Sequence, residues 1–140
     1  MTSGSPLPWK RVATLLAWAL VAACGCAKTM TVAQPRPIEV WRGGDDGLTL
    51  RFTAAVEEAL KDSPSFKEHG EASRTLIATI PTNLRWRDIG DRTRFDYKVL
   101  FSDTAKRPLG EAHGECWEDR MAECAARVRK RAEAISARVP

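Results

Sequence analysis

Three side chains that could bind a cation or move a proton alternate along one short segment: Glu111, His113 and Glu115. Residues two apart in a β-strand project from the same face, so a strand here would place a carboxylate on either side of an imidazole. Such a group can ligate a metal or raise the proton affinity of the histidine. The solvated outer face of an amphipathic strand has the same pattern. We adopt this second interpretation, which predicts no metal and no cofactor.

Motifs for catalysis are missing. The sequence has no G-x-S-x-G turn and no H-E-x-x-H helix, and His69 and His113 are its only histidines. The glycine- and aspartate-rich residues 43–47 lack the Lys-Ser/Thr of a phosphate-binding loop and the twelve-residue calcium pattern, so they predict a turn in which Asp46 caps a helix. We therefore expect no catalytic residues and a protein that is not an enzyme.

Two of the four cysteines, Cys116 and Cys124, lie close together near the end of the chain. A strand that runs directly into a helix can bring such Cα atoms within the roughly 7 Å that a disulfide allows. The pattern predicts a disulfide if the protein reaches an oxidising compartment, and two buried thiols otherwise. A metal site is disfavoured, because there is neither two-residue spacing nor a second pair.

A polar stretch over residues 81–92 contains the tripeptide Arg85-Trp86-Arg87 and reads as a long loop or hairpin tip that turns at Gly90-Asp91. Tryptophan and arginine dominate the energetics of binding interfaces. Arg85, Trp86 and Arg87 are therefore candidates for contacting a partner. The alternative is that Trp86 folds back and caps the core.

The charge of the chain is nearly balanced. Lys10 and Arg11 are the only charged residues before Cys24, which leaves 20 basic and 18 acidic residues from Cys24 onward and a net charge of +2. This balance argues against nucleic acid as a partner. Near the C-terminus four basic residues cluster: Arg127, Arg129, Lys130 and Arg131. They fit a solvated helix end or a site for anionic headgroups and lipopolysaccharide phosphates.

The first 23 residues have the form of an export signal. Lys10-Arg11 precedes residues 12–23 (VATLLAWALVAA), twelve residues that are apolar apart from Thr14. A membrane-spanning helix needs about 20 such residues, so this run suits a cleaved signal rather than a permanent span.

Val21-Ala22-Ala23-Cys24 resembles the lipobox of bacterial lipoprotein precursors. The resemblance implies cleavage before Cys24 and lipid attachment to that cysteine, with several acyl chains holding the protein at a membrane. Gly25 stands where an inner-membrane retention signal would have Asp, which favours the outer membrane, facing the periplasm. An ordinary secretory cleavage near Ala23, with Cys24 and Cys26 as free thiols, is the alternative.

The mature chain divides into a tether and one domain. Residues 24–37 form the lipidated N-terminus and a proline-containing tether, and residues 38–140 the domain. Apolar periodicity predicts four strands over residues 38–41, 75–80, 93–102 and 109–116, one helix after residue 47 and another from about residue 118. The order β-α-β-β-β-α predicts an α+β two-layer sandwich, a four-stranded sheet with two helices on one face.

This order of elements is similar to that of small envelope domains, such as the lipopolysaccharide-assembly lipoprotein and the amino-terminal domain of the Tol-system propeller protein. The similarity is one of topology and carries no mechanism. We expect a membrane-anchored lipoprotein with a non-catalytic accessory domain that binds another envelope protein. A lipid- or lipopolysaccharide-binding envelope-assembly lipoprotein is the alternative.

Overall fold

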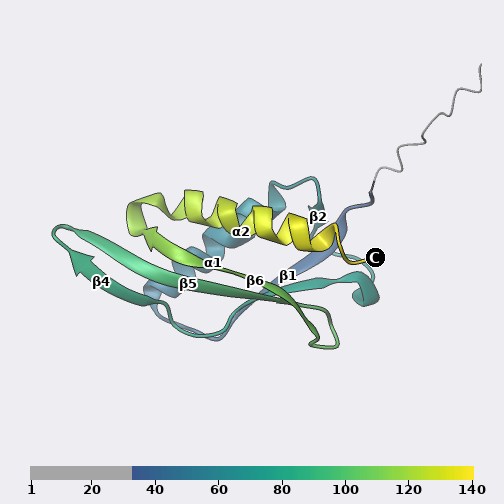
Figure 1. Ribbon diagram of the computed structural model, residues 1–140, viewed down its shortest axis with the longest axis horizontal. Helices are drawn as coiled ribbons and strands as arrows, with labels where there is room; N and C mark the ends of the chain where they lie inside the picture. The colour runs from purple at the N-terminus through teal and green to yellow at the C-terminus, as the bar shows by residue number, and fades with distance from the viewer. Residues whose placement is uncertain (1–32) are drawn as a thin grey trace, which may run out of the picture. The chain divides into compact units, whose positions relative to one another are not determined.

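Two helices pack on one face of an open mixed sheet and leave the other face uncovered (Figure 1). The computed structural model describes residues 33–140. Residues 1–23, Cys24 with its lipobox, and Cys26 lie outside the described residues. Within the described range no helix is long and apolar enough to cross a membrane.

The elements follow one another along the chain as β1 (Arg36–Arg42), α1 (Gly47–Lys61), β2 (Phe66–Lys67), β3 (Leu76–Ile80), β4 (Arg85–Ile89), β5 (Arg92–Ser102), β6 (Pro108–Trp117) and α2 (Met121–Ser136). Two 3₁₀ turns, Ala72–Arg74 and Glu118–Arg120, precede β3 and α2. The α+β class and the two helices agree with the sequence prediction. The predicted four-stranded sheet is wrong, because β2 and β4 bring the number of strands to six.

The two additional strands have no apolar alternation from which they could be predicted. β2 has only two residues, and β4 (RWRDI) is exposed along its whole length. In the sheet, β1 pairs in parallel with β2 and β3, whereas β5 pairs antiparallel with β3, β4 and β6. β3 and β4 both lie along the same side of β5, one after the other, and β6 lies along the other side.

The core lies between the sheet and the helices. β5 contributes four alternate residues, Phe95, Tyr97, Val99 and Phe101, which are all buried. Phe52 of α1 packs against Phe95 and Tyr97, with ring centroids 5.3 and 5.2 Å apart. α2 approaches β6 closely at Gly110, where a Cβ atom would lie 2.8 Å from a methyl carbon of Ile135. The absence of a side chain at Gly110 therefore lets α2 lie close to β6.

The start of α1 is fixed by its N-cap, Asp46, as predicted. Its Oδ1 atom accepts hydrogen bonds from the amides of Leu48 (3.0 Å) and Thr49 (2.9 Å). The Thr49 hydroxyl donates to Asp46 Oδ2 (2.6 Å) and accepts from the amide of Leu84 (2.9 Å). This chain of bonds attaches the residue before β4 to the first turn of α1.

Candidate binding site

The polar stretch over residues 81–92 forms a β-hairpin with β5. β4 pairs with β5 from Arg85 opposite Asp96 to Ile89 opposite Arg92, which leaves Gly90-Asp91 as a two-residue turn. Gly90 has a φ of +67°, a conformation that favours glycine at the first central position of such a turn. The predicted turn at Gly90-Asp91 is confirmed.

The hairpin extends beyond the end of the two helices (Figure 1). Its base is held by Leu84, which is buried in the core, whereas all five residues of β4 are exposed. Beyond Leu84 the helices leave β4 exposed, and only the start of α1 lies near it, beside Trp86. The hairpin is thus a projection from the domain and not part of its two-layer body.

Trp86 lies on the same face of the hairpin as the buried Phe95, directly opposite it in the register. Nevertheless Trp86 is 59% exposed. It borders a shallow hollow of about 310 Å³ whose other walls include Gly47 and Arg51 at the start of α1. The alternative that Trp86 caps the core is therefore wrong.

The two arginines beside Trp86 lie on the opposite face. Arg87 forms ion pairs with Glu115 of β6 (3.1 Å) and Asp96 of β5 (3.8 Å). Arg85 forms no ion pair with any of residues 33–140, so its charge is available to a partner. The sequence brought Arg85, Trp86 and Arg87 together as one candidate, and the structure separates them onto two faces.

A network of charges on β5, β6 and the Glu118–Arg120 turn braces the hairpin. Arg94 pairs with Glu115, and Arg92 pairs with Asp119 at 2.8 Å. The guanidinium groups of both arginines lie over the ring of Trp117, the nearer one, Arg92, 4.2 Å from its centroid. The hydrogen bond from Arg94 lowers the pKa of Glu115, and that from Arg92 lowers the pKa of Asp119. Sequence reasoning missed this brace, because its members become neighbours only through the strand register.

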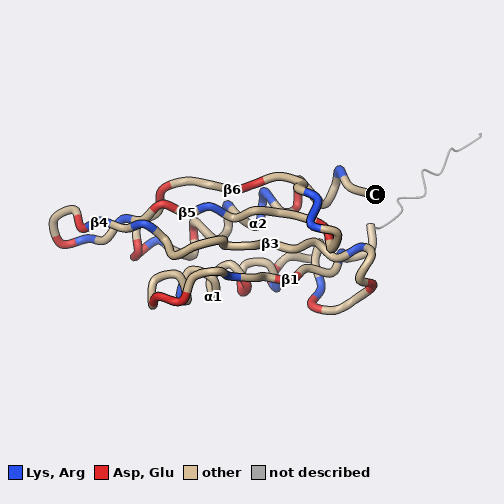
Figure 2. Tube along the Cα trace, turned by 90° about the horizontal axis from the view of Figure 1, so that it is seen from below, with Lys and Arg blue, Asp and Glu red and all other residues tan. Residues whose placement is uncertain are grey.

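Glu111, His113 and Glu115 alternate with the buried Ala112 and Cys116 of β6, so this row lies on the uncovered face of the sheet. Acidic positions of β6 and basic positions of β5 lie on neighbouring strands (Figure 2). Lys98 pairs with Glu111 at 3.1 Å, and the hydrogen bond from Lys98 lowers the pKa of Glu111. His113 Nδ1 lies 3.3 Å from Glu111 Oε1. Among residues 33–140 no three acidic, histidine or cysteine side chains are grouped as metal ligands. The carboxylate of Glu111 forms an ion pair with Lys98, and that of Glu115 forms ion pairs with Arg87 and Arg94.

Cys116 and Cys124 form the expected disulfide, with their Cα atoms 6.1 Å apart. Both are buried. The bridge joins the end of β6 to the first turn of α2.

The basic residues of α2 do not form one patch. Arg129 pairs with Glu133 (3.8 Å). Arg127 and Arg131 turn to the outer edge of β6 and donate to the backbone carbonyls of Glu115 (3.2 Å) and Glu111 (3.0 Å).

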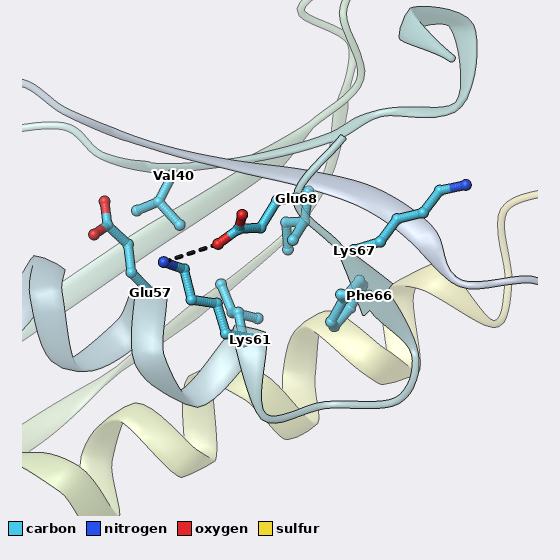
Figure 3. A pocket seen from close by; sticks show the side chains of 8 residues that line it. Val40, Glu57, Lys61, Phe66, Lys67 and Glu68 are labelled. Atoms are coloured by element: carbon cyan, nitrogen blue, oxygen red, sulfur yellow. Dashed lines mark ion pairs between the residues drawn. The ribbon is translucent and has the colours of Figure 1, made fainter. Parts of the chain in front are cut away.

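A second hollow lies beside β1, and Figure 3 shows its lining. Its volume is about 440 Å³, and its apolar side chains are Ile38, Val40, Leu60 and Phe66. Lys61 of α1 pairs with Glu68 across it at 2.8 Å, which raises the pKa of Lys61 and lowers that of Glu68. No strand among the described residues pairs with the outer edge of β1 beyond Pro37.

Comparison of the chain with protein-family models, with curated proteins and with solved structures finds no match.

Proposed function

We propose that this chain is a lipid-anchored bacterial envelope protein whose non-catalytic domain binds another envelope protein through the β4–β5 hairpin. The observation that carries the proposal is Trp86, 59% exposed on a projecting and braced hairpin. A large apolar side chain on a rigid support loses little conformational entropy when a partner buries it.

The charges around Trp86 indicate what the partner presents. Arg85 is next to Trp86 in the sequence but lies on the opposite face of the hairpin, and it forms no ion pair inside residues 33–140. Arg87 and Arg92 are already neutralised by Glu115 and Asp119. A partner that suits this tip has an apolar pocket for Trp86 on one face of the hairpin and an acidic group that reaches Arg85 on the other face, around the outer edge of β4.

The location rests on the sequence. The apolar run over residues 12–23 and the Val21-Ala22-Ala23-Cys24 lipobox support lipid attachment at Cys24, and Gly25 supports the outer membrane, facing the periplasm. The Cys116–Cys124 disulfide is compatible with an exported protein.

The partner hypothesis can be tested with two tryptophans that are exposed to a similar degree, Trp86 (59%) and Trp41 (52%). Trp86→Ala should keep a near-normal melting temperature and lose the proteins that co-purify with the tethered chain from its own membranes. Trp41→Ala is the control, and it should keep both the normal melting temperature and the co-purifying proteins. A Trp86→Ala protein that unfolds, or that stays folded with its partners bound, would contradict the proposal.

The anchor is tested separately by metabolic labelling with a fatty acid. Cys24→Ala should abolish the label and leave uncleaved precursor or a released soluble domain, whereas Cys26→Ala should be labelled normally. Unchanged labelling of Cys24→Ala, or a label lost only in Cys26→Ala, would exclude this anchor.

A further inference from the structure

A notch opens along the outer edge of β6, on the side of the domain away from the hollow beside β1. Its walls are Arg127 and Arg131 of α2, its rim includes His113, and its volume is about 670 Å³. No strand among residues 33–140 pairs with this edge of β6.

Tyr97 forms the floor of the notch, and its position there is unusual for a core residue. The side chain is only 5% exposed and belongs to the same buried row as Phe95, Val99 and Phe101. Its ring lies across Gly114, where a Cβ atom would come within 3.0 Å of the phenol oxygen. The absence of a side chain at residue 114 therefore lets the hydroxyl of Tyr97 reach the notch.

The hydroxyl has no partner in the described part of the chain. The hydrogen bonds at this edge run from Arg127 and Arg131 to backbone carbonyls and to Cys124 Sγ, and none involves Tyr97. The hydroxyl is not one of the fully buried polar atoms that lack a partner, so it is open to the notch. Phenylalanine would fill the same core space without this polar group. The hydroxyl is thus a donor that the fold itself does not use.

The charges of the two arginines are not compensated locally. Neither Arg127 nor Arg131 forms an ion pair with any residue in the range 33–140, whereas Arg129 on the same helix pairs with Glu133. Glu111 and Glu115 also line the notch, but their carboxylates form ion pairs with Lys98 and Arg94. Two guanidinium groups four residues apart on one helix therefore flank a hydroxyl donor.

We propose that this notch binds a phosphate group, held by Arg127, Arg131 and the hydroxyl of Tyr97. A phosphate dianion has enough acceptor oxygens to receive hydrogen bonds from three directions, and arginine is suited to this geometry. The volume of the notch leaves room for the molecule that carries the phosphate. The site is separate from the hairpin and does not depend on the function proposed for it.

The first experiment titrates the full ¹⁵N-labelled chain, in a non-ionic detergent at pH 7.5, with inorganic phosphate, and with chloride at equal ionic strength. The NMR chemical shifts of the amides of His113 and Gly114 should change saturably with phosphate and should not change with chloride. Arg131→Gln and Arg127→Gln should weaken binding at least tenfold, and Tyr97→Phe about three- to tenfold.

Lys130→Gln is the matched control, because it removes the same charge from the same helix outside the notch. It should bind phosphate as the unmodified chain does. Absence of a saturable shift in the unmodified chain, or equal weakening in Lys130→Gln, would overturn the proposal. Tyr97→Phe preserves the ring that the core needs, so the proposal can be tested even if an arginine variant does not fold.

A second titration identifies the source of the phosphate. Dihexanoyl phosphatidylglycerol, used below its micelle concentration, should bind at least tenfold more tightly than inorganic phosphate if the ligand is a lipid headgroup. Equal affinities indicate a free phosphate or a soluble phosphate ester. Lipid binding that Arg131→Gln leaves unchanged would exclude the notch as the headgroup site.

Discussion

Trp86 and Phe95 are opposite each other across β4 and β5 and point to the same side of the sheet, yet Phe95 is fully buried and Trp86 is 59% exposed. Phe52 of α1 packs against the ring of Phe95, with centroids 5.3 Å apart. No helix residue encloses Trp86 in this way; it only borders the shallow hollow at the start of α1. The two aromatic residues therefore differ in exposure because the helices cover Phe95 and end before they cover Trp86.

This comparison shows that one strand can serve two purposes. The middle and last part of β5 lies between neighbouring strands and under the helices, where its apolar residues stabilise the fold. The first part of β5 extends with β4 past the helices and is held in place by Arg92, Arg94 and Trp117. The apolar side chain of Trp86 at the projecting end is mostly exposed, so we expect it to contribute little to the stability of the fold.

The largest expected effect is that of Phe95→Ala. Removing this ring leaves a cavity in the core and should lower the free energy of unfolding by about 3–5 kcal/mol. Trp86→Ala, the matched control on the same face, should change it by less than about 0.5 kcal/mol. Urea unfolding measures both. Similar losses in the two variants would contradict the comparison.

Removal of the disulfide should have the next largest effect. Cys116 and Cys124 enclose a loop with a sequence separation of 8, and losing the bridge should lower the free energy of unfolding by about 2.5 kcal/mol. The double variant Cys116→Ala/Cys124→Ala, compared with the oxidised chain in urea, measures this. Intact mass without reductant should also be about two units below the reduced mass. Alkylation of both thiols without reductant would exclude the bridge.

The smallest of the three effects is expected at Asp46, on the boundary between α1 and the hairpin. The hydrogen bonds from Thr49 lower the pKa of the Asp46 carboxyl, so ionised Asp46 stabilises the folded state above its unfolded pKa of about 4. This stabilisation should disappear as the pH falls from about 4 through the lowered pKa of the folded state.

Asp46→Asn is the control for this titration, because asparagine also caps helices but does not ionise. Thermal unfolding between pH 7 and pH 2 should show a steeper loss of stability below pH 4 in the unmodified chain than in Asp46→Asn. Parallel curves would show that the cap does not titrate in this range.

Much of the body of the fold could be predicted from local patterns. The alternation of Phe95, Tyr97, Val99 and Phe101 identified β5, and the apolar spacing after Asp46 identified α1. β2 could not be found, because two residues carry no period. β4 could not be assigned as a strand, because its pairing with β5 and not a buried face makes it one.

The candidate sites show the same limit. Arg85, Trp86 and Arg87 could be selected by residue type. The exposure of Trp86 could not be predicted, because it depends on where the helices end. The notch was not predictable, because Tyr97 and Gly114 are opposite each other only in the β5–β6 register, and Arg127 and Arg131 reach them from α2. The sequence shows the basic cluster near the C-terminus. It does not show that two of its members, Arg127 and Arg131, lie beside the hydroxyl of Tyr97.

The parallel pairing of β1 with β3 has a consequence for the kinetics of folding. Ile38 pairs with Leu76, 38 residues later, whereas β4, β5, β6 and α2 follow one another with short connections. Closing the longer loop is slower, because more chain entropy is lost before the first contact forms. We expect the antiparallel half and α2 to assemble first and β1 to join last. Because β1 is synthesised before β3, the segment that becomes β1 has no β3 to pair with until the later segment has been made.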